Sequence, residues 1–136
     1  MDASEAASRP PWQVSGIRIV ERVLIVDDEP DSAEMMAEML AALGYQTRFA
    51  LDGTSALALA GAFEPQVVLM DVSLPDIDGC QVARQLRADP RFRSALLVAV
   101  TGWSGKDREL KAREAGFDHY IVKPVQIEAL QSLFGR

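Results

Sequence analysis

The feature that most constrains the fold is a fivefold alternation of short apolar runs with longer helical stretches, beginning at Arg22. Strands that alternate with helices predict βαβ units and a parallel sheet. In the first helical stretch, one face carries Ala33, Met36, Ala37, Leu40 and Leu43 at helical spacing, and Gly44 ends the helix. The predicted strands cover residues 23–26, 46–50, 67–70, 96–100 and 120–122, and the helices 31–43, 54–62, 78–88, 105–115 and 126–134.

Four of the five runs are almost wholly apolar, as expected for strands covered on both faces. The second run is different because Gln46 and Arg48 alternate with Phe49, which places this strand at an edge of the sheet. We therefore predict an α/β fold with a doubly wound, five-stranded parallel sheet in the order 2-1-3-4-5. This is the flavodoxin-like arrangement, with five helices on the two faces.

Length and charge narrow the function classes. The chain has 136 residues and a formal net charge of −6, which suits one acidic domain and argues against a direct nucleic-acid partner. The sequence shows neither an apolar stretch of membrane-spanning length nor a signal peptide, so we expect a cytoplasmic protein without a membrane partner. The lone cysteine, Cys80, has no second thiol with which to form an internal disulfide.

Residues 1–21 differ in composition from the rest of the chain. They are rich in Ala and Ser and contain the pair Pro10-Pro11, so we expect a flexible leader. Trp12, Val14 and Ile17 follow no clear period. A tail packed on the domain, a linker remnant and a partner-binding segment all stay open for this leader.

Polar residues follow directly on four of the apolar runs. Asp27 and Asp28 follow the first, Asp71 the third, Thr101 the fourth and Lys123 the fifth. The carboxyl ends of parallel strands meet at one edge of the sheet, where ligands bind near the reversal of strand order. We therefore expect these residues to lie close together.

The chemistry of this set is specific. Three carboxylates repel one another unless a cation neutralises them, and an all-oxygen ligand set suits Mg²⁺. An ammonium from Lys123 and a hydroxyl from Thr101 would complete a cradle for phosphoryl oxygens. Asp71 leaves the middle strand, between the acidic pair and Thr101, and is the natural nucleophile because carboxylates form acyl phosphates.

Four segments at these strand ends closely resemble the receiver domain of two-component response regulators. They are VLIVDDEPD (23–31), VVLMDVSLPDIDG (67–79), VAVTGW (98–103) and HYIVKPV (119–125). The resemblance spans about residues 22–134, and residues 22–136 are expected to form one receiver domain of the stand-alone or hybrid-kinase type. It implies a phosphorylatable switch in phosphorelay signal transduction, with Mg²⁺ as cofactor.

The resemblance also assigns roles at the site. Asp71 would accept a phosphoryl group from a phosphohistidine of a sensor histidine kinase or histidine phosphotransfer protein. Asp28, Asp71 and the backbone carbonyl of Ser73 would ligate Mg²⁺ directly, and Asp27 would act through water. Lys123 and Thr101 would contact the phosphoryl oxygens.

Four further positions carry expectations from the family. Tyr120 would be the aromatic switch that turns inward as Thr101 moves toward the phosphate. The bond between Lys123 and Pro124 should be cis, as an X-Pro bond permits. Gly102 should leave the phosphorylation pocket open, and Trp103 should shield the acyl phosphate from water.

The resemblance implies a domain that catalyses its own phosphorylation and dephosphorylation rather than an enzyme with a separate substrate. The alternative is a haloacid-dehalogenase-like, Mg-dependent phosphatase. That class carries its nucleophile on the first strand and an Asp two residues later, where this chain has Ser73 after Asp71. With few residues after Lys123, output should be contact with a downstream protein, and the family allows a homodimer through the fourth and fifth helices.

Overall fold

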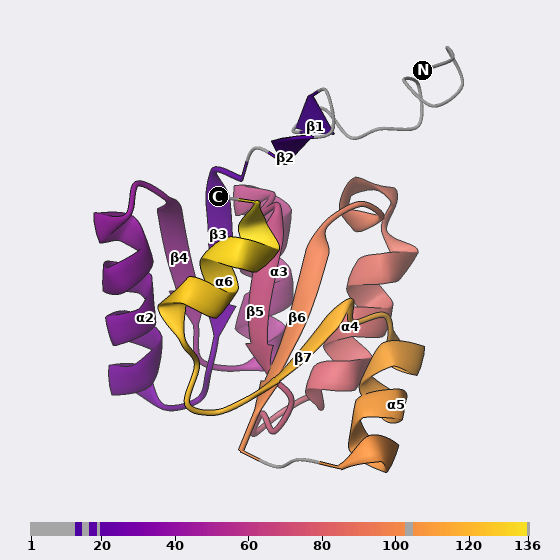
Figure 1. The fold of residues 1–136 in the computed structure, drawn as a ribbon. Helices are drawn as coiled ribbons and strands as arrows, with labels where there is room; N and C mark the ends of the chain where they lie inside the picture. Colours follow the sequence, from indigo (N-terminus) through magenta and orange to yellow (C-terminus); the bar gives the residue numbers. More distant parts are fainter. Residues whose placement is uncertain (1–12, 15–16, 19, 103–104, 136) are drawn as a thin grey trace.

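The computed structural model describes residues 13–14, 17–18, 20–102 and 105–135. Five parallel strands form one sheet in the order β4-β3-β5-β6-β7 (Figure 1). In chain order this is 2-1-3-4-5, so the predicted fold is confirmed. The strands are β3 (Arg22–Val26), β4 (Gln46–Ala50), β5 (Val67–Asp71), β6 (Leu96–Thr101) and β7 (His119–Val122).

Five helices cover the two faces of this sheet. Helices α2 and α6 contribute to the apolar core on one face, and α3, α4 and α5 to the core on the other (Figure 1). Each helix begins and ends within one residue of its predicted range. Among the described residues, no helix combines the length and apolar character needed to cross a membrane. The helices are α2 (Pro30–Ala42), α3 (Gly53–Phe63), α4 (Gly79–Ala88), α5 (Lys106–Ala115) and α6 (Ile127–Phe134), with a short 3₁₀ turn, η1 (Pro90–Phe92), after α4.

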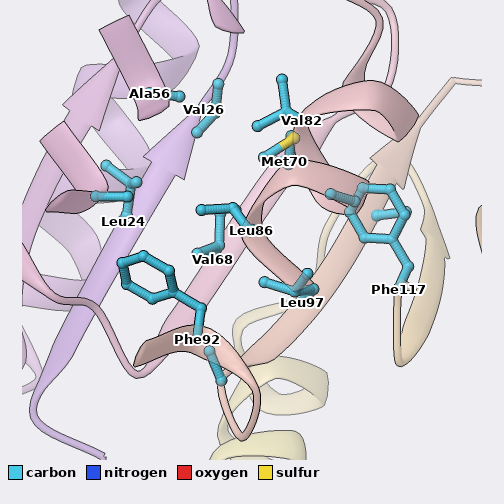
Figure 2. Close-up of a cluster of buried hydrophobic side chains, with 14 of the residues drawn as sticks. Leu24, Val26, Ala56, Val68, Met70, Val82, Leu86, Phe92, Leu97 and Phe117 are labelled. Atoms are coloured by element: carbon cyan, nitrogen blue, oxygen red, sulfur yellow. The ribbon is translucent and has the colours of Figure 1, made fainter. Parts of the chain in front are cut away.

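The central strands are apolar throughout because both of their faces are buried. Along β5, Val67 and Leu69 join the core under α2 and α6, whereas Val68 and Met70 join the core under α3, α4 and α5. Figure 2 shows the second core, in which Met70 of β5 lies among side chains of the sheet and of α4. Successive side chains of a strand point to opposite faces, so one apolar run fills two cores.

The edge strand β4 has the exposed pattern expected of it. Arg48 stacks over the ring of Phe63 at 5.2 Å, and Phe49 is 40% exposed. Two residues after the end of the preceding helix α2 comes Gly44, whose φ of 102° lies in the left-handed region that favours glycine. Both features follow the sequence prediction.

Part of the predicted leader has regular structure. Strand β1 (Gln13–Val14) pairs antiparallel with β2 (Ile17–Arg18), a hairpin that the sequence did not reveal. Val20 is 4% exposed and belongs to the core under α2 and α6. Val20, which precedes the expected boundary at residue 22, therefore packs into this core.

One arginine organises the loops at the amino ends of β6 and β7. Arg87 of α4 donates hydrogen bonds to the carbonyls of Phe92, Arg93, Ala95 and Gly116 and to the carboxylate of Asp118. Asp118 also accepts a bond from the Leu97 amide at 2.8 Å. A cation with so many acceptors holds two loops together, and a guanidinium is the group with enough fixed donors to do this.

Candidate functional site

The sheet brings three predicted carboxylates together at its carboxyl edge. One oxygen from each of Asp27, Asp28 and Asp71 lies within 4.8 Å of the others. Asp27 follows β3 and Asp71 ends β5, and these strands are neighbours in the sheet. Asp27 is only 9% exposed, so its charge is partly removed from water. The cluster is a concentration of negative charge that favours binding of a cation.

Lys123, which follows β7, supplies the positive charge inside the cluster. Its ammonium Nζ lies 3.1 Å from Asp71 Oδ2 and 3.5 Å from Asp27 Oδ2. Burial by itself would lower the pKa of Lys123, but the hydrogen bonds and charges of Asp71 and Asp27 outweigh it and raise that pKa above its usual value. Lys123 is thus held in its charged form beside Asp71.

Backbone amides orient the carboxylates. The Glu29 amide donates to Asp27 Oδ1 at 3.0 Å, and the Ser73 amide donates to Asp71 Oδ1 at 2.9 Å. These bonds leave the second oxygen of each carboxylate for Lys123 or a metal. Oxygen ligands at this spacing fit Mg²⁺, and Asp27, Asp28 and Asp71 are the residues that could hold it.

Thr101 and Tyr120 lie on the other side of Asp71. Thr101 ends β6 and is 1% exposed, while Tyr120 of β7 is half-buried. Both line a pocket of about 420 Å³ that Ser73 also lines. The sheet thus places the two predicted switch residues around one hollow next to the loop after Asp71.

The remaining predicted positions have different outcomes. The peptide bond between Lys123 and Pro124 is cis. A Cβ placed on Gly102 would meet nothing within 4 Å, so this position has open space. Trp103 lies outside the described residues.

A scan of family models matches residues 23–134 to the response regulator receiver domain. The chain belongs to this family. The receiver is 32% identical over 121 residues to the polar-differentiation response regulator DivK of Brucella ovis, covering 86% of this chain and 98% of that protein. It is 33% identical over 117 residues to DivK of Brucella anthropi, with 83% and 95% coverage.

Solved structures give the same assignment. Vibrio cholerae CheY4 matches the receiver with a TM-score of 0.79 and 25% identity, over 84% of this chain and 95% of that one. A CheY-like receiver domain from Methylobacillus flagellatus matches with a TM-score of 0.72 and 35% identity, over the same shares. A Burkholderia pseudomallei response regulator, solved with a phosphorylated aspartic acid and a calcium ion, matches with a TM-score of 0.76 and 27% identity, over 82% and 65%. The receiver is therefore a phosphorylatable module of two-component signalling.

A groove of about 660 Å³ beside the carboxylates was not expected from the sequence. It brings Asp27, Asp71 and Lys123 together with three methionines of α2. Met35 is 60% exposed and Met39 42% exposed. A recurrence of methionines on one face of a helix was the available signal, but it does not distinguish core from surface. The groove makes Asp71 reachable from the α2 side of the receiver.

The two acidic residues near the end of the loop after Asp71 have separate contacts. Asp78 caps α4 by accepting a hydrogen bond from the Cys80 amide at 2.7 Å. Asp76 is a residue of this loop whose carboxylate contacts the start of α3. These contacts join residues that are 22 or 23 positions apart in the chain, and such a separation leaves no periodic signal in a sequence.

Proposed function

We propose that Asp71 is the phosphoacceptor of this receiver and that its donor is a phosphohistidine on a sensor histidine kinase or histidine phosphotransfer protein. An Asp71 oxygen would form a bond to phosphorus while the bond from phosphorus to the imidazole nitrogen breaks. The imidazole leaves with the electron pair and takes up a proton. The observation that carries the proposal is the Lys123 ammonium 3.1 Å from Asp71, within a cluster of three carboxylates.

The neighbouring residues would stabilise this transfer. Asp28, Asp71 and the Ser73 carbonyl would hold Mg²⁺, with Asp27 acting through water. When bound, the ion would supply positive charge against the phosphoryl oxygens. Lys123 would pair with one of those oxygens, and the Thr101 hydroxyl would donate a hydrogen bond to another.

Thr101 and Tyr120 would pass the change to the surface. Both line one pocket, so movement of Thr101 toward a phosphoryl group changes the space available to the Tyr120 ring. The resulting surface would bind a downstream protein, and a homodimer through α5 and α6 is one form of such contact. If phosphorylation changed the partner affinity of Tyr120→Ala as fully as that of the wild type, this role would be excluded.

Hydrolysis of unrelated phosphate esters is not supported. The acidic pair follows the first strand of the sheet, where a haloacid-dehalogenase-like phosphatase has its nucleophile, and residue 73 is Ser. The only reactions proposed for this receiver are its own phosphorylation and dephosphorylation.

The test is phosphoryl uptake by Asp71→Asn. The purified receiver is incubated with Mg²⁺ and a small acyl-phosphate donor, and intact-mass spectrometry follows the added phosphoryl group. Wild type and Asp89→Asn should take up the group, because Asp89 pairs with Arg91 away from the cluster. Asp71→Asn should take up none. Uptake by Asp71→Asn equal to that of the wild type would contradict the proposal.

A further inference from the structure

The loop after Asp71, residues 72–78, is bonded to a helix that contributes no ligand to the site. Asp76 lies in this loop, and its Oδ1 accepts a hydrogen bond from the Gly53 amide at 2.7 Å. Its Oδ2 accepts bonds from the Thr54 amide at 2.9 Å and the Thr54 hydroxyl at 2.6 Å. One side chain thus joins the loop to the first two residues of α3.

These bonds are not needed to begin α3. Asp52 already caps that helix by accepting a hydrogen bond from the Ser55 amide at 2.7 Å. Asp76 is therefore a second carboxylate at the same helix start, and it comes from a distant part of the chain. Its donors, first the Thr54 hydroxyl and then the Gly53 amide, hold the pKa of its carboxyl well below the usual range.

The helix start and the loop also fit closely together. A Cβ on Gly53 would lie 2.9 Å from Val82 Cγ2 and 3.1 Å from Ile77 Cβ, so only glycine allows this approach. At the end of the loop, a Cβ on Gly79 would lie 2.7 Å from Val72 Cα. Close contacts therefore hold the loop at Val72 and at Ile77, and the hydrogen bonds of Asp76 hold it between them.

Ser73 lies between two of these held positions, Val72 and Asp76. Its amide is bonded to Asp71 Oδ1 at 2.9 Å, and Asp76 follows three residues later. We propose that Asp76 is a positioning residue, which holds loop 72–78 against α3 so that Ser73 and the backbone after Asp71 stay in the geometry that binds Mg²⁺. This inference rests on the proposed function of Asp71 and Ser73. Groups that orient metal ligands without touching the ion commonly change metal affinity about tenfold or more.

The experiment compares Asp76→Ala with Asp52→Ala. Both variants remove a carboxylate from the start of α3, but only Asp76→Ala releases the loop. Isothermal titration with MgCl₂ should give a dissociation constant about tenfold higher for Asp76→Ala. For Asp52→Ala, the constant should stay within about twofold of the wild-type value, although capping is lost. Urea unfolding of each variant shows how much stability was removed.

Two milder variants grade the effect and keep the test open if Asp76→Ala does not fold. Asp76→Asn can still accept from the Gly53 amide, but its amide nitrogen cannot accept from the Thr54 amide. Thr54→Val removes only the hydroxyl bond. The dissociation constants should rise in the order wild type, Thr54→Val, Asp76→Asn, Asp76→Ala, and hydrogen exchange in loop 72–78 should quicken in the same order.

Unchanged Mg²⁺ affinity in folded Asp76→Ala or Asp76→Asn would overturn the inference, as would an equal loss in Asp52→Ala. The phosphoryl-uptake experiment keeps this failure separate from failure of the proposed function. If Asp71→Asn loses uptake while the Asp76 variants bind Mg²⁺ normally, Asp71 stays the acceptor and only the role of Asp76 is wrong.

Discussion

The two ends of the central sheet differ in how their charged side chains are paired. At the amino ends of β6 and β7, the Arg87 cation has four carbonyls and the Asp118 carboxylate as acceptors. At the carboxyl ends, three carboxylates lie close together, and the Lys123 ammonium pairs with two of them, Asp27 and Asp71, so negative charge is in surplus. A network in which each charge has its partners stabilises a fold, whereas a cluster with surplus negative charge favours binding of a cation. We therefore expect mutations at the two ends to change different properties.

The largest effect on stability should come from Arg87→Ala. Removing the guanidinium leaves several carbonyls and the Asp118 carboxylate without their donor, so the free energy of unfolding should fall by about 3 kcal/mol. Urea titration followed by circular dichroism measures this loss. Phosphoryl uptake per folded molecule should stay at the wild-type level, and a large drop in uptake would show that the two ends are not independent.

Gly116→Ala tests the same end of the sheet, because Gly116 is in contact with Arg87. Gly116 has a φ of 113°, and a Cβ there would lie 2.6 Å from Arg87 Cγ. The left-handed backbone and this overlap should together cost about 2 kcal/mol of unfolding free energy. In the Arg87→Ala background the overlap is removed, so the second mutation should cost less, which a double-mutant cycle measures. Additive losses would contradict the contact.

The carboxyl end should gain stability from its ligand. At a Mg²⁺ concentration ten times the dissociation constant, binding to the folded state should raise the unfolding free energy by about 1.4 kcal/mol, and EDTA should reverse the gain. Arg87→Ala should keep the full gain, since its site is at the other end. Asp28→Asn should lose most of it at the same Mg²⁺ concentration. An equal gain in Asp28→Asn would exclude this carboxylate as a ligand.

The smallest effect concerns Asp76, whose carboxylate has its hydrogen-bond donors, although it lies at the end of the sheet with surplus negative charge. Because its folded pKa is depressed, it contributes stability above the unfolded pKa of about 4 and loses that contribution as pH falls through the folded value. The stability difference between wild type and Asp76→Asn should therefore shrink as pH falls from about 5 to about 2. A difference that stayed constant with pH would show that the Asp76 charge has no part in the contact.

The sequence predicted those features that repeat or that follow a strand directly. The alternation of apolar runs is a direct record of which faces are buried, so the strand order and each helix end were predictable. Asp27, Asp71 and Lys123 each follow a buried run, and parallel topology alone requires them to meet. Local caps such as Asp52 were predictable because donor and acceptor lie three residues apart.

Contacts made by one side chain across a long stretch of chain were not predictable. Asp76 and Asp78 belong to the same short acidic segment, yet one caps its own helix and the other a helix 22 residues earlier. Arg87 is one of two arginines in α4, and most of its acceptors are backbone carbonyls that carry no signal in the sequence. The β1–β2 hairpin is too short for strand alternation to indicate it.

The order in which the site residues occur along the chain has a consequence during synthesis. Lys123 meets Asp27 across 96 residues and Asp71 across 52 residues. A nascent chain whose β7 is still inside the ribosome already has the Asp71 carboxylate but lacks the Lys123 ammonium beside it. Pairings between residues this far apart also require closure of long loops, which costs entropy and slows folding. If phosphorylation of Asp71 requires Lys123, as proposed above, it can occur only after β7 has joined the sheet.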